Sequence, residues 1–202
     1  MKGDGKMATL KNKGNIKFGN KKLPKTTAVF NICAAHDCPS AKRGLCQVVN
    51  AGHTCYARRD EYLWKFPLAY RRRQEKAWDS LSASEFVAEF AGLMNRRRSP
   101  TTALRLNESG DFRRQADVIK AVEIARGLAK LGVMVYCYTA RKDLSFRNIG
   151  PLVINGSGFK VTGEFRFIRS KKDLPKGYRI CPGDCRTCNR CLKGKSTGVL
   201  PH

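Results

Sequence analysis

TALRLNESGDFRRQADVIKAVEIARGLAKLGVMVYCYT, residues 102–139, contains two strand-like segments with a helix-like segment between them. The segments 102–107 and 133–139 are short and apolar, whereas 115–131 has apolar residues at helical spacing. A strand, a helix and a strand in this order form a βαβ unit, whose strands lie parallel and whose crossover is right-handed. This part of the chain therefore predicts an α/β fold.

Further strands are expected on both sides of this unit. The sequence predicts a strand at 26–32, directly before Cys33, and helices at 58–78 and 84–94. Later strands are expected at 152–155, 164–168 and 178–181. A total of about six strands predicts either an open sheet or an incomplete parallel (β/α)6-type barrel with cysteine-rich loops at the carboxyl ends of its strands, where functional residues belong.

The composition divides the chain into three parts. Residues 1–25 contain eight Lys and one acidic residue without an apolar period, so we expect a basic flexible arm. Residues 26–192 are expected to form one α/β iron–sulfur domain, and 193–202 a tail. The chain as a whole is 42% hydrophobic, which is enough for a core in 202 residues.

The charge of the chain points to a polyanionic partner. With 40 Lys and Arg against 16 Asp and Glu, the net charge is +24, which favours DNA or RNA over an acidic membrane surface. We find neither a secretory apolar segment near Met1 nor a run of 18 apolar residues, so we expect a cytoplasmic protein without membrane contact. The candidate nucleic-acid-binding residues are arginines in runs: Arg71, Arg72, Arg73, Arg96, Arg97, Arg98, Arg113 and Arg114.

Nine cysteines in a reducing compartment are more typical of metal or cluster ligands than of disulfides. Cys137 lies in an apolar segment and is expected to be a small buried side chain. The other eight form two groups of four: Cys33, Cys38, Cys46 and Cys55, then Cys181, Cys185, Cys188 and Cys191.

The second group places four thiols within eleven residues, which predicts a metal or cluster site. Zinc sites usually pair two CxxC knuckles across a longer loop, whereas closely spaced cysteines are typical of cubane clusters. We therefore expect one or two 4Fe–4S clusters, with zinc as the alternative. His36 and His53 lie in the first cysteine loop as alternative ligands, although a solvent-facing or capping role is more usual for such residues.

A polar group follows the strand at 102–107. Asn107, Glu108 and Asp111 are candidate catalytic residues, because their carboxylates and amide suit a substrate ammonium, a ribose or a divalent metal. The alternative is that this segment only forms a turn and caps the next helix. Arg141 follows the next strand and is a candidate anion-binding residue.

Cys33, the Cys55-Tyr56-Ala57 element, the RLNESGD segment at 105–111 and the closing cysteine run resemble the phage family called gene product eighty-eight. The resemblance implies a bacteriophage or prophage origin, and the host cytoplasm as location, but no particular reaction. The chain is more distantly similar to radical S-adenosylmethionine (radical SAM) proteins, whose partial barrel carries a cluster in the loop after the first strand. That similarity implies S-adenosylmethionine as a cofactor, held by Asn107 and Glu108.

Three functions stay open from the sequence. The first is an iron–sulfur protein that binds nucleic acid and uses its clusters structurally or for redox chemistry. The second is a radical SAM-like enzyme acting on nucleic acid or protein, although the CxxxCxxC spacing of that superfamily is absent from the first loop and a fourth cysteine would close the open iron. The third is a metal-dependent nuclease using Glu108 and Asp111.

Overall fold

The computed structural model describes residues 9–10 and 15–200 and contains one eight-stranded sheet with the order β1-β2-β3-β4-β5-β6-β8-β7. β1 pairs antiparallel with β2, and every other neighbouring pair is parallel. Within the described residues the sheet ends at β1 and β7, so it is open rather than closed into a barrel. The strands are β1 Lys17–Phe18, β2 Thr27–Phe30, β3 Ala103–Leu106, β4 Met134–Thr139, β5 Val153–Ser157, β6 Gly163–Phe167, β7 Arg179–Ile180 and β8 Thr197–Val199.

The predicted βαβ unit is confirmed as β3, α6 and β4. Helix α6 spans Gln115–Ala129, and β3 and β4 are parallel neighbours in the sheet. Alternate strand residues point to opposite faces of a sheet. Leu104 and Cys137 therefore belong to the core beneath α6, and Cys137 is the buried apolar side chain that the sequence predicts.

The helix expected at 58–78 is two helices, α3 Tyr56–Leu63 and α4 Lys65–Ser80, separated by Trp64 in an extended conformation. The reason is Pro67. Its ring would clash with the carbonyl of the residue four positions earlier in a continuous helix, but is tolerated in the first turn of a new one. The next helix, α5 Ala83–Asn95, begins with a capping box between Ser82 and Glu85.

Two strands lie in the parts of the chain that we expected to be an arm and a tail. β1 lies within 1–25, and β8 lies within 193–202, where it is inserted between β6 and β7. Residues 1–8 and 11–14 of the expected arm are outside the described part of the chain. β1 and β8 are only two and three residues long and adjoin Lys- and Gly-rich sequence, which is why neither was predicted.

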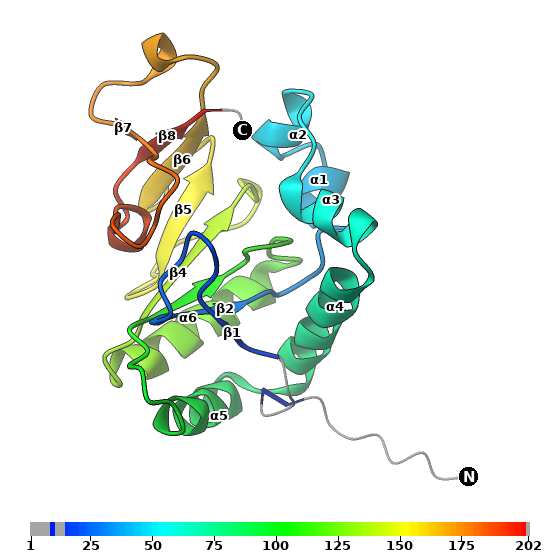
Figure 1. Ribbon diagram of the computed structural model, residues 1–202, viewed down its shortest axis with the longest axis vertical. Coiled ribbons are helices and arrows are strands. Elements are labelled where there is room, and N and C mark those ends of the chain that lie inside the picture. Colours follow the sequence, from blue (N-terminus) through cyan, green and yellow to red (C-terminus); the bar gives the residue numbers. More distant parts are fainter. Residues whose placement is uncertain (1–8, 11–14, 201–202) are drawn as a thin grey trace.

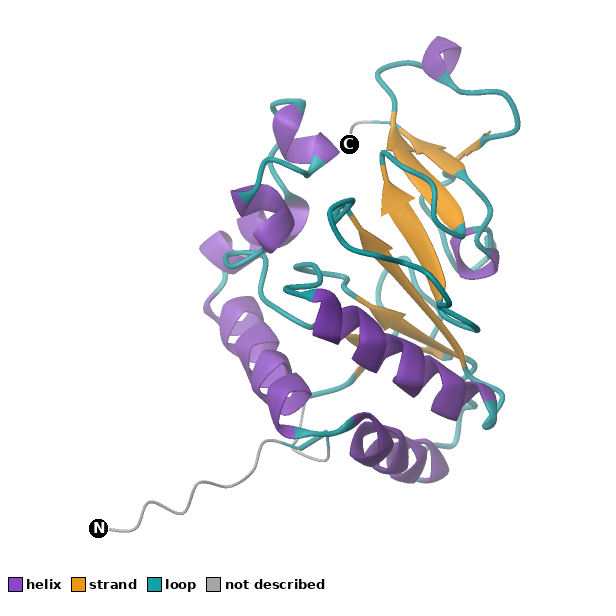
Figure 2. Cartoon of the chain, turned by 180° about the vertical axis from the view of Figure 1, so that it is seen from behind, coloured by secondary structure: helices purple, strands orange, loops and turns teal. Residues whose placement is uncertain are grey.

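Helices and loops cover the two faces of the sheet differently (Figure 1). α5 and α6 pack on the outer face of β2, β3 and β4, which Figure 2 shows from behind. The short helices α1 Pro39–Lys42 and α2 Gln47–Asn50 lie with α3 near the carboxyl ends of the strands, where Gln47 donates to Ser157 Oγ at 2.8 Å. In the described part of the chain, no helix is both long and apolar enough to cross a membrane.

Candidate metal centres

The second cysteine group lies in the connection from β7 to β8, residues 181–196. Because β7 and β8 are parallel, this connection must return from the carboxyl end of β7 to the amino end of β8. It does so across the face of the sheet opposite α5 and α6, which we call the inner face. The Cys185 N–H donates to the carbonyl of Lys22 in the β1–β2 hairpin at 2.9 Å, and Asn155 of β5 donates to the carbonyl of Cys191 at 2.9 Å.

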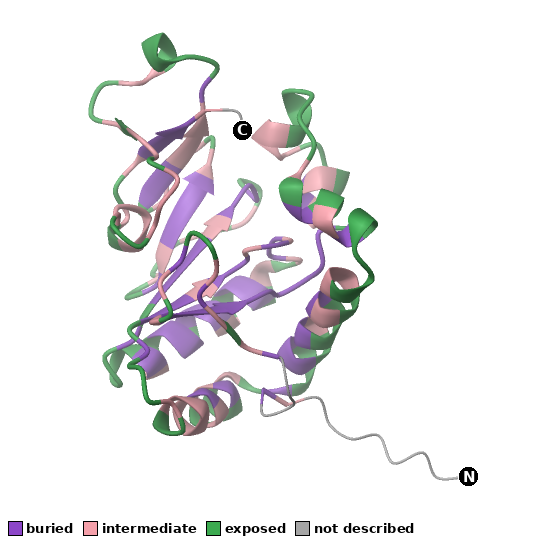
Figure 3. Ribbon diagram, viewed as in Figure 1, coloured by how far each residue is buried: buried purple, intermediate pink, exposed green. Residues whose placement is uncertain are grey.

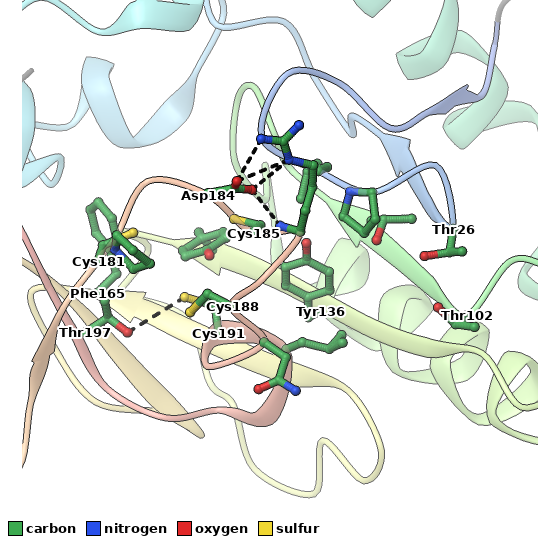
Figure 4. A pocket seen from close by; sticks show the side chains of 18 residues that line it. Thr26, Thr102, Tyr136, Phe165, Cys181, Asp184, Cys185, Cys188, Cys191 and Thr197 are labelled. Carbon is green, nitrogen blue, oxygen red and sulfur yellow. Dashed lines mark hydrogen bonds and ion pairs between the residues drawn. The ribbon is translucent and has the colours of Figure 1, made fainter.

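All four cysteines of this group line one cavity of about 200 Å³ (Figure 4). Thr27 and Thr102 also line it, which places the cavity near the amino ends of β2 and β3. The loop begins at the carboxyl end of β7, where Cys181 directly follows the strand as expected, but the cavity lies away from this end of the sheet. The physical reason is the parallel pairing of β7 with β8, which makes the loop cross back over the sheet.

The thiols of the second group act on one another electrostatically. Burial raises the pKa of Cys185, the Arg105 guanidinium lowers it, and the other three cysteines of the group raise it further. Burial also raises the pKa of Cys191, against hydrogen bonds from Tyr138 and Thr197. Thiols that oppose one another's ionisation are stabilised as thiolates by a cation placed between them. The donor set therefore suits a tetrathiolate metal or an iron–sulfur cluster.

A finished coordination sphere is not present in residues 9–10 and 15–200. There, no three His, Cys, Asp or Glu side chains are arranged as ligands of one metal ion. The four thiols of the second group share a cavity, and ligation would require them to turn toward a common centre.

The first cysteine group begins at the carboxyl end of β2. Cys33 is fully buried, and its thiol accepts from the N–H of Asp111 at 3.3 Å and donates to the Asp111 carbonyl at 3.2 Å. Burial raises the pKa of this thiol well above its usual value. Gly110, at φ +70°, lies so close that an added Cβ would be 2.3 Å from the Cys33 carbonyl oxygen. Cys33 thus joins the loop after β2 to the loop after β3.

The other thiols of the first group precede helices. Cys38, Cys46 and Cys55 are the residues directly before α1, α2 and α3, and none of their side chains makes a capping hydrogen bond. Burial raises the pKa of Cys38 to about 12, and the charges of Asp111 and Cys46 add to this effect. The charges of thiols in this group also raise one another's pKa values: Cys38 raises the pKa of Cys33, and Cys46 raises that of Cys38.

Asp111 is the centre of a hydrogen-bond network at this edge of the sheet. Its carboxylate accepts from Ser40 Oγ and Thr139 Oγ1, both at 2.6 Å, and from the N–H groups of Phe112 and Ala140, both at 2.8 Å. Burial raises the pKa of Asp111, and these four donors oppose the shift. The carboxylate therefore holds α1 and the loops after β3 and β4 together. It does not cap the next helix, because the Arg114 N–H at the start of α6 donates to Asp117.

Glu108 and Asn107 do not take part in the hydrogen-bond network of Asp111. Glu108 accepts from Asn20 Nδ2 at 2.6 Å and lies 3.8 Å from Lys17 Nζ. Asn107 adopts φ +57°, and its buried Nδ2 has no partner among the described residues. The structure does not bring the two carboxylates together as a shared metal site.

The candidate arginines fall into two classes. Arg71, Arg113 and Arg141 are engaged inside the protein: Arg71 pairs with Glu61 at 2.7 Å and Arg141 with Asp143 at 2.7 Å. Arg113 binds three acids, Glu75, Asp79 and Asp117. Arg97 lies over the ring of Phe18. The exposed members of the runs are Arg72, Arg73, Arg96, Arg98 and Arg114, of which Arg72 pairs with Asp37 at 3.5 Å.

Sequence reasoning missed Arg105. This residue lies on the inner face of β3, with its guanidinium 5.0 Å from the centre of the Tyr138 ring. It lowers the pKa values of both Cys185 and Cys191. The available signal was a charged residue between Leu104 and Leu106 in an otherwise apolar strand.

Comparison with known protein families gives a match. The family model described as gene product 88 matches residues 2–157, which include the first cysteine group and end before the second. No curated protein and no solved structure matches this chain. The phage-family resemblance is therefore confirmed, whereas the more distant similarity to radical SAM proteins is not confirmed.

Proposed function

The chain belongs to the gene product 88 family, and we propose that it is a phage iron–sulfur protein that binds nucleic acid. The observation that carries the proposal is the cavity lined by Cys181, Cys185, Cys188 and Cys191. Four thiols in one small cavity, with charges that oppose one another, match the ligand chemistry of a 4Fe–4S cluster. Such a cluster supplies either a cross-link or a one-electron redox centre.

The surroundings of the cavity have the properties that such a centre needs. Tyr136, Tyr138 and Phe165 line its sheet side and would keep water from the sulfur atoms. Arg105 would offset part of the negative charge of four thiolates. Thr197 Oγ1 lies 3.8 Å from Cys191 Sγ, which would orient that ligand.

Binding to nucleic acid is supported by the charge and by where the charge is exposed. The net charge of +24 is an excess of cations over all acids, and Arg73, Arg96, Arg98 and Arg114 are exposed on the surface. Cations on the surface attract phosphates and release counterions on binding, so the affinity should fall steeply with salt.

The experiment is an analysis of iron, sulfide and zinc in protein purified without oxygen, together with the visible absorption spectrum. About four irons and four sulfides for each cluster, with a broad brown absorbance, are expected. Cys185→Ser should lower the iron content, whereas Cys137→Ala, which removes a cysteine outside both groups, should not. A colourless protein with zinc would reject the iron–sulfur centre and leave a zinc-stapled nucleic-acid-binding protein.

A radical SAM-like enzyme is the second candidate, and one observation favours it. The thiol of Cys33 is occupied by the backbone of Asp111, which leaves Cys38, Cys46 and Cys55 as the uncommitted thiols of the first group. Three thiolate ligands would leave one iron of a 4Fe–4S cluster open for S-adenosylmethionine. Cleavage of S-adenosylmethionine under reducing conditions, lost in Cys46→Ser, would support this candidate, and its absence in iron-loaded protein would reject it. The nuclease hypothesis has no comparable support, because Asp111 is fully hydrogen-bonded.

A further inference from the structure

The junction of α3 and α4 exposes a run of large apolar side chains. Tyr62 and Phe66 are 90% and 86% exposed, and Trp64 and Leu63 are 64% and 52% exposed. Large apolar residues that adjoin one another on a surface mark interaction sites, whereas single ones are common. We call residues 58–73 the α3–α4 elbow; Figure 3 shows its exposed turn on the flank of the molecule.

Buried contacts between α3 and α4 hold the elbow rigidly. Glu61 and Arg71, both buried, form an ion pair at 2.7 Å that joins α3 to α4 across the break at Trp64. Glu61 also accepts from the N–H groups of Ala35 and His36, and Arg71 also donates to the Ala57 carbonyl at 2.8 Å. The exposed rings are therefore displayed by a fixed backbone, which reduces the entropy lost when a ligand binds to them.

Positive charges surround the rings. Arg58 lies one helical turn before Tyr62 on α3, and Arg73 lies two turns after Phe66 on α4, so each cation shares a helix face with a ring. Arg59, Lys65 and Arg72 are also exposed, and of these Arg72 pairs with Asp37 at 3.5 Å. The two acids of the elbow are the half-buried Asp60 and the buried Glu61, which is neutralised by Arg71.

We propose that the α3–α4 elbow is a stacking platform for single-stranded nucleic acid, with bases on Tyr62, Trp64 and Phe66 and phosphates on the surrounding cations. Exposed aromatic rings set among arginines and lysines are the features by which proteins bind single strands without strong sequence preference. A duplex keeps its bases stacked on one another, so it offers only phosphates to this surface. This inference rests on the proposed function, because it specifies which form of nucleic acid the chain binds.

The experiment measures binding of the full chain to a labelled single-stranded oligonucleotide and to the duplex of the same sequence by fluorescence anisotropy. The triple variant Tyr62→Ala/Trp64→Ala/Phe66→Ala is expected to weaken single-strand binding by about a hundredfold or more, since each base–ring stack contributes about 1–3 kcal/mol. Duplex binding should change little. Leu131→Ala, which truncates an exposed apolar residue elsewhere, is the matched control.

Tryptophan fluorescence gives a second readout. The chain has two tryptophans, of which Trp78 is buried at 1% exposure, so quenching by an added single strand would report on Trp64. Trp64→Phe should keep the affinity within a few-fold and lose the quenching. Circular dichroism of each variant confirms that the fold is retained.

The outcomes separate this inference from the function on which it depends. If the unchanged protein binds neither form, the nucleic-acid function itself fails. If it binds both forms and the triple variant binds them as tightly, nucleic acid is bound elsewhere and the elbow inference is overturned. Loss of binding to anionic phospholipid vesicles in the triple variant, with oligonucleotide binding intact, would overturn it in favour of a membrane surface.

Discussion

Cys33 is buried in the framework of the sheet and hydrogen-bonded to the backbone of Asp111, whereas Cys185 is half-buried in a loop that crosses the inner face of that sheet. The first position lies within the part of the chain that matches the family model, and the second lies beyond it. The two cysteine groups therefore differ in how they depend on a bound centre. The first is anchored to the sheet through Cys33, whereas the second needs a centre to bring its thiols together.

Asp111→Ala tests the protein framework around the first group and should have the largest effect. It would leave two hydroxyls and two backbone N–H groups without their buried acceptor, at a cost of about 3–5 kcal/mol in the free energy of unfolding. The measurement is urea denaturation of metal-free protein. Asp184→Ala removes an acid whose ion-pair partner among the described residues is its neighbour Arg186, and should unfold like the unchanged protein. Equal midpoints for the two variants would contradict a framework role for Asp111.

Cys33→Ala and Cys185→Ala compare the two groups directly. In metal-free, reduced protein, Cys33→Ala should lower the free energy of unfolding by about 2 kcal/mol, because a hydrogen bond and buried volume are lost. Cys185→Ala should cost less than about 0.5 kcal/mol in the same assay, but should reduce metal content. If the two variants are equally destabilised without metal, the contrast between a framework cysteine and a loop cysteine is wrong.

The same contrast describes what the sequence could and could not reveal. The βαβ unit and the start of α5 at Ser82 were predictable, because periodicity and capping are local properties. The path of the loop after Cys181 was not, since it follows from the pairing of β8 with β6 and β7, which are short strands separated from β8 in the sequence. Likewise, the runs of arginine looked alike in sequence, and only the fold shows that Arg71 faces Glu61.

A pH titration tests the burial of the first group in metal-free protein. The pKa of Cys38 is raised by burial to about 12 from a usual value near 9. Because the pKa of Cys38 is higher in the folded than in the unfolded protein, ionisation of this thiol costs no stability below pH 9 and lowers the free energy of unfolding as the pH rises toward 12. Between pH 8 and pH 10 the loss should be about 1 kcal/mol, measured by denaturation at each pH. Cys38→Ala should remove this part of the pH dependence. If stability depends on pH in the same way with and without this substitution, the Cys38 thiol is exposed to water.

Arg105→Gln tests the second group alone and should have the smallest effect. The guanidinium lowers the pKa values of Cys185 and Cys191, so its loss raises them and makes the thiolates needed for metal binding harder to form. Because Arg105 acts through charge, we expect metal affinity to fall by about fivefold, less than the loss of a hydrogen-bonded partner of a ligand causes. Competition with a chelator measures this affinity, and Arg166→Gln, whose arginine pairs with Glu164, is the control. If Arg105→Gln retains metal as tightly as the control, the charge of Arg105 does not act on the second group. If Arg105→Gln loses only the metal bound by Cys181–Cys191, the two groups bind metal independently of each other. The first group then depends on the framework of the sheet, and the metal affinity of the second depends on a single charge on the inner face.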